Sequence, residues 1–248
     1  MRRPHRAAFA LIAVLAAAGR ASAQTNADRL RIDIDAGGQF SSNAVDATTT
    51  KPVYLENATI QTSDRVRRGV LADAGISWRL AGPISIGAIG SWFMASHDGD
   101  ITASVPHPFF FKSPRTVAGT ANLRREEVAV HLVGIYTIHA TAAVDVALSG
   151  GPSFFQVRQD VATDIVFGDT YPYDAPTFTS ASTQRVSGTN AGFNAGADVS
   201  VRLSRHAGLG GGIRFSKATV NVTVPNGGGT ISLDAGGAQA LGGLRMYF

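Results

Sequence analysis

Strict alternation of side chains over residues 240–248 is the feature that most restricts how this chain can fold. One set of positions is apolar or glycine and ends on the C-terminal aromatic residue: Ala240, Gly242, Leu244, Met246 and Phe248. The positions between them include the one charged residue of the stretch, Arg245. A period of two residues is that of a β-strand, whose successive side chains point to opposite faces. The stretch therefore predicts a strand with an apolar environment on one face and a more polar one on the other.

The same alternation recurs in seven earlier stretches, which together with the last predict eight strands: 30–40, 70–80, 84–94, 128–138, 144–154, 191–203 and 209–215. Short turns are expected at 81–83, 139–141 and 204–206. Long loops are expected over the polar segment that follows residue 40 to about Asp64, over 97–122 and over 159–184. Between Lys217 and Gly237 the apolar positions slip by one residue, which we interpret as a projecting hairpin with a bulge or twist at its base.

Connections that alternate between long and short are typical of β-barrels in outer membranes, whereas periodicity alone also fits a soluble sandwich or barrel. Aromatic residues support the membrane interpretation because they gather near both ends of the aliphatic stretches, as Trp78 and Tyr136 do at the short turns. The charged residues on the opposite face are expected to line a polar lumen as an ionic network: Asp33, Asp35, Asp73, Arg79, Asp145, Asp198, Arg202, Arg214 and Arg245.

The N-terminus has the features of an export signal. Arginines precede the apolar run 7–18, and Ala21-Ser22-Ala23 offers a cleavage site. We expect residues 1–23 to be a cleaved signal peptide and 24–248 to form one barrel domain. Removing four arginines lowers Lys+Arg from 22 to 18 against 18 Asp+Glu, so the basic excess belongs to the signal and does not indicate a nucleic-acid partner. The chain has no cysteine, which excludes a disulfide scaffold and a thiol metal site.

The closing strand that ends on Phe248, together with this pattern of strands and turns, resembles the small eight-stranded bacterial outer-membrane barrels, similar to the transmembrane domain of outer-membrane protein A and to the opacity and adhesion-invasion proteins. The resemblance implies an all-β, antiparallel up-and-down transmembrane barrel with short periplasmic turns and long extracellular loops. It also implies that Phe248 belongs to an assembly signal for the barrel-assembly machinery. Lipid and lipopolysaccharide of the outer membrane would surround the protein, which we expect to be a monomer.

Three functions are consistent with such a barrel. An eight-stranded barrel has an interior just wide enough for side chains, so the inward charges are expected to pair and fill it. This favours a structural or surface-interaction role, with a small ion or solute channel as the alternative. A lipid A-modifying enzyme is a third hypothesis, but it needs a His–Ser pair facing lipid near the outer rim, and none is found. We therefore expect no enzymatic activity, no cofactor and no metal site.

The predicted loops contain aromatic residues where specificity would lie. Phe109, Phe110 and Phe111 follow one another in the second loop, and Tyr171 and Tyr173 lie in the third. Exposed apolar clusters often mark binding surfaces. They would bind a host or surface ligand, or else pack on neighbouring loops or rest among lipopolysaccharide headgroups.

Overall fold

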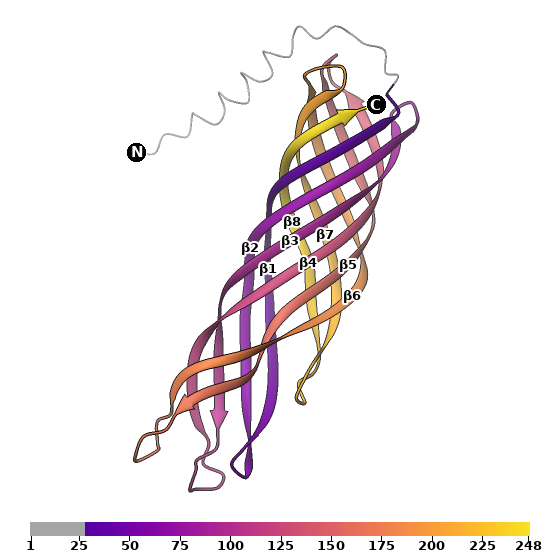
Figure 1. The fold of residues 1–248 in the computed structure, drawn as a ribbon. Helices are drawn as coiled ribbons and strands as arrows, with labels where there is room; N and C mark the ends of the chain where they lie inside the picture. The colour runs from indigo at the N-terminus through magenta and orange to yellow at the C-terminus, as the bar shows by residue number, and fades with distance from the viewer. Residues whose placement is uncertain (1–27) are drawn as a thin grey trace, which may run out of the picture.

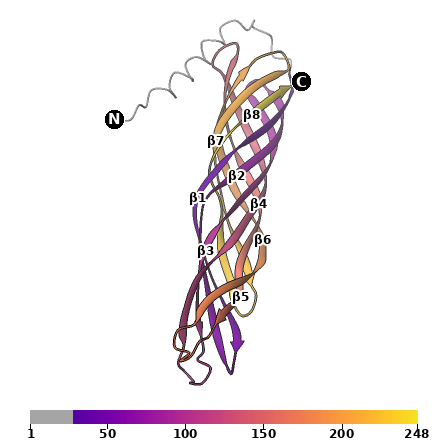
Figure 2. The same cartoon turned by 60° about the vertical axis from the view of Figure 1, so that its left-hand side comes forward.

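The computed structural model describes residues 28–248, and the proposed signal peptide lies outside them. Eight antiparallel strands form one closed ring in sequence order, in which β1 pairs with both β2 and β8. The result is a long, narrow barrel of tilted strands, seen from two sides in Figures 1 and 2. The strands are β1 Leu30–Val53, β2 Glu56–Ala81, β3 Ile84–Val105, β4 Arg115–His139, β5 Val144–Gly168, β6 Thr177–Arg202, β7 Ala207–Val224 and β8 Gly229–Tyr247.

The two ends of the barrel differ in their connections. The turn end, at the top of Figure 1, holds the short connections 82–83, 140–143 and 203–206 and the C-terminus. The hairpin end holds the connections 54–55, 106–114, 169–176 and 225–228. The long loops predicted from the sequence are therefore wrong in extent: most of residues 41–64, 97–122 and 159–184 belong to strands that continue past the predicted ones. These residues still alternate, with Ile101, Ala103 and Val105 on one face of β3 and polar residues on the other. This alternation is the pattern of a β-strand.

The half of the barrel nearest the turn end carries apolar residues on its outside; we call it the banded half. Ile34, Ile86 and Leu132 are each about half exposed on this outer surface. Exposed aromatic residues lie at both borders, with Trp78, Tyr136 and Phe248 toward the turn end and Phe40, Trp92, Phe154 and Phe215 toward the hairpin end. Each strand contributes a segment such as 70–80, close to the ~9–11 residues with which a tilted strand crosses a bilayer.

Beyond the aromatic residues at the border toward the hairpin end, the apolar side chains lie on the inner face of the strands and the polar ones on the outer face. We call this part the projecting half. Its outer surface is polar, and its interior is a core of aliphatic side chains. On the interior side Val157, Val161, Val220 and Leu233 have no exposed surface. A second cluster, built around Ile60, Ile101 and Val117, lies beside the first. The barrel therefore continues past the banded half as a filled structure.

Opposite walls meet inside the projecting half. The Ala162 backbone in β5 donates to Thr62 Oγ of β2 at 3.1 Å and accepts from Thr49 Oγ of β1 at 3.1 Å. All three residues are buried. These bonds satisfy polar groups that would otherwise be costly inside an apolar core. The lumen is thus closed by contact between strands that are not neighbours in the ring.

The ring of hydrogen bonds is complete only in the banded half. Pairing of β1 with β8 ends at Phe40 and Ala238, pairing of β6 with β7 ends at Phe193 and Lys217, and pairing of β4 with β5 ends at Arg125 and Gln159. The projecting half consequently divides into a β1–β4 sheet and the β5–β6 and β7–β8 hairpins. Asparagine side chains cap two of the seams: Asn43 Nδ2 donates to Asp234 O at 2.8 Å, and Asn190 Nδ2 donates to Thr219 O at 2.6 Å.

The predicted slip in β7 is not a slip of the strand. Arg214, Ser216, Ala218 and Val220 all lie on the buried face of β7, and the pairing with β8 continues without a register shift to the turn at 225–228. The hairpin does project, as predicted, and the only irregular backbone at its base is the positive φ of Gly236 (83°) and Gly237 (146°) in β8. The apolar positions change parity because the apolar environment moves from outside the barrel to inside.

Within the described part of the chain, no helix is both long enough and apolar enough to span a membrane.

Candidate functional site

Charged side chains from three strands meet in the lumen near the turn end. Arg245 of β8 lies opposite Asp33 of β1 in the strand register, and its guanidinium contacts Asp35 Oδ1 at 2.5 Å, Asp198 Oδ2 at 2.6 Å and Asp33 Oδ1 at 3.4 Å. Arg31 joins the same group through Asp33 at 2.7 Å and Asp198 at 2.8 Å. Two arginines and three aspartates thus neutralise most of one another's charge, which buried charges require.

A cavity of about 90 Å³ opens beside this cluster. Asp73 and Arg214 line it and are joined at 2.7 Å. Arg214 also donates to Ser91 Oγ at 3.0 Å and, through Nε, to Gln239 Oε1 at 2.6 Å. The glycines of β6 and β7 leave room here, because a Cβ at Gly210 would lie 2.6 Å from Arg245 Nε. The cavity is therefore a small, charged space within the lumen.

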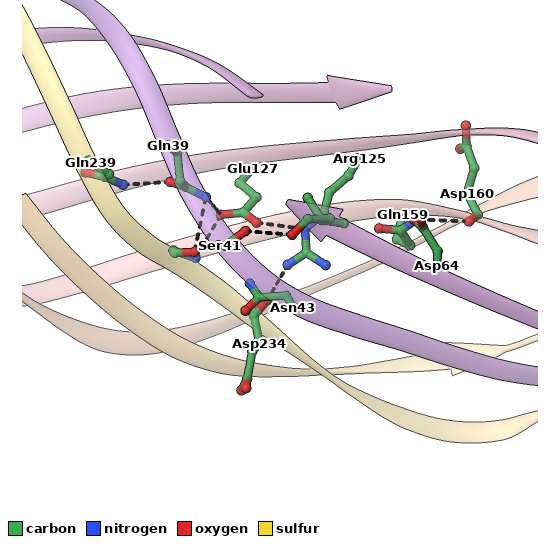
Figure 3. Close-up of polar contacts among 12 residues, drawn as sticks. Gln39, Ser41, Asn43, Asp64, Arg125, Glu127, Gln159, Asp160, Asp234 and Gln239 are labelled. Atoms are coloured by element: carbon green, nitrogen blue, oxygen red, sulfur yellow. Dashed lines mark hydrogen bonds and ion pairs between the residues drawn. The ribbon is translucent and has the colours of Figure 1, made fainter. Parts of the chain in front are cut away.

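A chain of buried polar groups continues from Arg214 toward the hairpin end (Figure 3). Gln239 Nε2 donates to Gln39 Oε1 at 2.7 Å, Gln39 Nε2 donates to Glu127 Oε2 at 3.2 Å, and Arg125 Nε donates to Glu127 Oε1 at 2.7 Å. Arg125 is fully buried. Its guanidinium also binds the Asp234 carbonyl of β8, while the Gly236 amide donates to Glu127 at 2.9 Å. The Arg125–Glu127 pair of β4 thereby ties β8 across the lumen, just beyond the end of the β1–β8 ladder.

The polar chain ends against the apolar core of the projecting half. Gln159 Nε2 donates to Asp64 at 3.3 Å, and His97 Nε2 lies 2.9 Å from the same carboxylate. Asp64 and Gln159 are buried. Beyond them the interior is aliphatic, beginning with Val45 and Val161. Any path for an ion along the lumen would have to cross this apolar segment.

Three residues of the predicted ionic network lie apart from its centre. Arg202 contacts Asp28 at 2.5 Å and stacks 4.0 Å from the ring centroid of Tyr247. Asp145 contacts His139 Nδ1 at 2.5 Å near the turn end. Arg79 has no ion pair within residues 28–248, although its backbone amide donates to Arg29 O at 2.8 Å. The predicted network is therefore one central group with two separate pairs and one unpaired arginine around it.

Sequence reasoning missed Arg31, Gln39, Arg125, Glu127 and Gln239 as members of the lumen network. All five occupy inward positions of their strands, so the alternation could have found them. Glu127 and Arg125 were overlooked because strand four was predicted to begin at 128, one residue past the pair.

A histidine and a serine also meet in the lumen. His131 Nδ1 lies 2.7 Å from Ser153 Oγ, which accepts a 2.9 Å bond from Asn194 Nδ2. His131 and Ser153 have no exposed surface, and Phe155 packs edge-on against the imidazole at 5.6 Å. The pair does not face lipid at the outer rim, and its burial leaves no room for a substrate. The contact gives His131 Nδ1 and Ser153 Oγ a hydrogen-bond partner inside the lumen.

The tips of three hairpins are locked together at the far end of the projecting half. Arg115 of β4 is buried and donates through Nη1 to Asp169 Oδ1 at 2.5 Å and to Tyr173 O at 2.6 Å. Its Nη2 donates to Pro106 O at 2.8 Å. Tyr54, between β1 and β2, donates its hydroxyl to Asp169 Oδ2 at 3.1 Å. Hydrogen bonds from Arg115 lower the pKa of the Asp169 carboxyl. We call this set of contacts the tip lock.

The predicted loop aromatics surround the tip lock. Phe109, Phe110 and Phe111 are 68%, 65% and 69% exposed, and Tyr171 is 84% exposed. Tyr173 is only half-buried and packs edge-on against Phe109 at 5.3 Å. His107 fixes the start of the phenylalanine run because its Nδ1 accepts from the Phe109 and Phe110 amides at 3.1 and 3.2 Å. Sequence reasoning missed Tyr54 and Leu55, which the β1–β2 turn exposes beside them.

Over residues 28–248, His, Cys, Asp and Glu side chains form no group of three or more that could hold a metal ion.

No family model and no curated protein matches the sequence. Among solved structures, the chain is similar to the outer membrane protein OprG from Pseudomonas aeruginosa, with a TM-score of 0.49 and 10% identity over 90% of this chain and 96% of that one. It is also similar to Neisserial surface protein A, with a TM-score of 0.41 and 14% identity over 88% and 97% of the two chains. The outer membrane protease OmpT from Escherichia coli gives a TM-score of 0.43 and 11% identity over 92% and 100%.

With identities of 14% or less and TM-scores below 0.5, these likenesses assign neither a family nor a function to the chain. The ring of eight strands and the apolar outer band are properties of this structure in their own right. They confirm the fold expected from the sequence: the chain is an eight-stranded antiparallel up-and-down β-barrel.

Proposed function

We propose that this protein is inserted in the bacterial outer membrane through its banded half and acts through the projecting half, by supporting the envelope or binding at its surface. The apolar outer band with aromatic borders supports the membrane placement. Short turns are typical of the periplasmic side, so the hairpin tips point away from the cell. Residues 1–23 would direct export, and the strand ending at Phe248 would engage the barrel-assembly machinery.

The apolar filling of the projecting half is the observation that carries this proposal. Side chains from β1, β5, β7 and β8 pack into one cluster across the interior. An ion that crosses it would lose its hydration without gaining a polar partner, which is strongly unfavourable. The filling favours a solid presenting structure over a conduit.

Single-channel recording of the folded protein in planar bilayers tests the proposal. We expect no conductance from samples whose folding is verified by heat-dependent mobility on a denaturing gel. A matched control replaces Val161 and Val220 with glycine, which thins the filling and is the variant most expected to leak. Stable conductance steps from the unaltered protein would contradict the proposal.

A channel remains the second candidate function, favoured by the charged cavity of about 90 Å³ near the turn end. Ions would enter the cavity from the periplasmic side. An exchange of hydrogen-bond partners between Glu127 and its neighbours would then have to open the remaining length of the lumen. Conductance that appears in Glu127→Gln but not in the unaltered protein would support such a gate.

We propose no enzymatic activity. OmpT, a protease, shares the barrel architecture, so the fold does not decide this point. The buried His131–Ser153 pair lacks access to substrate. Unchanged lipid A acyl chains and intact peptide substrates in cells that overproduce the protein are the expected results.

The hairpin tips are the proposed binding surface, with Phe109, Phe110, Phe111, Tyr171 and Tyr173 at its centre. Replacing the three phenylalanines with serine is expected to reduce attachment of expressing cells to their target surface. Unchanged attachment would contradict a binding role for the tips.

A further inference from the structure

We propose that the hairpin tips bind a phospholipid bilayer other than the one the barrel spans, by placing aromatic side chains among its headgroups. This inference rests on the proposed function and names the partner of the same surface. The side chains concerned form what we call the tip platform: Tyr54, Leu55, Phe109, Phe110, Phe111 and Tyr171.

The tip platform is apolar and open to water. Its least exposed member, Tyr54, is 55% exposed, and Leu55 and Tyr171 are each 84% exposed. Apolar side chains that gather in an exposed region often mark a surface that binds another protein or a membrane. These residues lie at the end of the projecting half, where the neighbouring outer wall is mostly polar, with the half-exposed Val166 of β5 as an exception.

The tip lock prevents the platform from burying itself. Arg115 is 6% exposed and bonds to three separate points of the tips, namely the Asp169 carboxylate and the carbonyls of Pro106 and Tyr173. Lys112, which has a positive φ of 57°, donates its amide to Glu56 at 3.2 Å and so joins the second hairpin to the first. The phenylalanines are held in fixed turns beside these bonds. Binding therefore costs little ordering of the tips.

The shape of the platform favours a soft partner. Its side chains come from three separate turns, and each exposes more than half of its surface, so none forms a wall of a deep socket for a protein anchor. A bilayer needs no socket, because lipids move apart around an inserted ring. Aromatic side chains are the residues that commonly occupy such an interface.

Charge indicates which kind of bilayer surface fits. Lys112 adjoins Phe111 and is exposed, and Asp174 is exposed nearby with its carboxylate 3.9 Å from His107 Nε2. Arg115 and Asp169 neutralise each other within the lock. The platform therefore lacks the cationic patch that an acidic glycan or strongly anionic membrane would require. A zwitterionic phospholipid surface matches this near-neutral balance, with Lys112 able to reach a phosphate as its neighbour inserts.

The platform stands too far out to serve as an anchor in its own membrane. From Phe154, at the border of the band, β5 continues to Gly168; at ~3.3 Å per residue this is roughly 45 Å of strand. Figure 1 shows the three tips together at the far end, with the β7–β8 hairpin ending short of them. The bilayer that they contact must be a second one.

The absence of cysteine from the chain allows a direct test. Ser113→Cys, next to the platform, would carry a polarity-sensitive dye on the full-length protein held in nanodiscs. We expect zwitterionic phosphatidylcholine vesicles to shift the dye emission to the blue and to carry the protein upward in flotation. A label at Thr223→Cys, on the polar wall of β7, is expected to show no shift.

Variants separate insertion from mere proximity. Replacing Phe109, Phe110 and Phe111 with serine is expected to weaken vesicle binding on the order of 10- to 100-fold, whereas replacing them with leucine is expected to retain most of it, because burial of apolar area drives the contact. Heat-dependent gel mobility verifies that each variant is folded. Raising the salt concentration should leave binding unchanged, since screening weakens only charge contacts.

The inference is overturned if labelled protein shows neither emission shift nor flotation, or if binding occurs only with anionic vesicles and is lost in salt. Cell attachment that depends on the phenylalanines without vesicle binding would indicate a protein or glycan partner; the proposed function would then stand and the bilayer would be rejected. Conductance of the unaltered protein, in contrast, would contradict the proposed function itself.

Discussion

The banded and projecting halves are built from the same strands with opposite chemistry. On β7, Ile213 faces outward in the banded half and is 68% exposed, whereas Val220 faces inward in the projecting half and has no exposed surface. The strand between them keeps its alternation and its pairing with β8. An apolar position therefore does not by itself distinguish the inside of such a barrel from the outside, because the environment of each face changes partway along the strand.

The junction between the halves is where substitution is expected to have the largest effect. Glu127→Leu would leave the guanidinium of Arg125 buried without its carboxylate, at a cost of about 3–5 kcal/mol in the free energy of unfolding. Converting Arg125 to Met in the same protein is expected to recover most of this loss, since no unpaired charge remains. Urea unfolding in lipid vesicles measures both. Equal stability of the single and double variants would show that the pair does not hold the junction.

An arginine placed on the outward face of β7 is expected to have different effects in the two halves. Ile213→Arg would place a charge in the proposed lipid contact and is expected to cost about 2–4 kcal/mol near the bilayer centre. Thr219→Arg, on the same face of β7 but in the projecting half, is expected to change stability by less than about 0.5 kcal/mol because water surrounds it. Folding yield and urea midpoint distinguish the two. Similar losses at both positions would mean that the two halves share one environment.

A hydroxyl group introduced on the inward face of β7 tests whether the interior of the projecting half is apolar. Val220→Thr would bury a polar group in the aliphatic core, at about 1–3 kcal/mol. Thr223→Val, on the wet face of the same hairpin, is expected to be nearly neutral. Faster protease cleavage of the β7–β8 hairpin would show that Val220→Thr destabilises it. If Val220→Thr were silent, the interior of the projecting half would have to be wet.

The smallest expected effect concerns pH at the tips. The pKa of Asp169 is held below its ordinary value of 3.8 by hydrogen bonds from Arg115. The lock is therefore at full strength above that ordinary pKa and weakens only as pH falls through the lowered one. Protease cleavage within 106–114 is expected to rise only at pH values below the ordinary 3.8, as Asp169 becomes protonated. Asp169→Asn should remove this pH dependence, and a rise near neutral pH would assign it to a different group.

The sequence predicted the banded half in detail, because there the outward face of every strand is uniformly apolar. The contact of Arg245 with Asp35 follows from that alternation once strand eight is paired with strand one. The projecting half was predicted as loops because residues such as Thr48, Thr102 and Ser182 are typical of loops in composition, and prolines 106, 108 and 114 reinforced this. Those prolines do lie in a loop, but it covers only 106–114.

The tip lock could not have been predicted from local pattern. Arg115, Asp169 and Tyr54 lie in three different hairpins, and the lean of the β5–β6 hairpin toward the other two tips brings them together (Figure 1). Alternation states which face a side chain occupies, but it contains no information about how far strands lean toward a partner across the lumen. The register of β5 with β6 also shifts between Ala162 and Asp164, which alternation did not predict.

The seam between β1 and β8 is confined to residues 31–40 and 238–247. The first and last strands can therefore join entirely within the banded half, before any hairpin of the projecting half has met its neighbours. Each hairpin can then change in length during evolution without disturbing barrel closure. The same mode of barrel closure could therefore serve related proteins whose projecting hairpins differ completely in length and sequence.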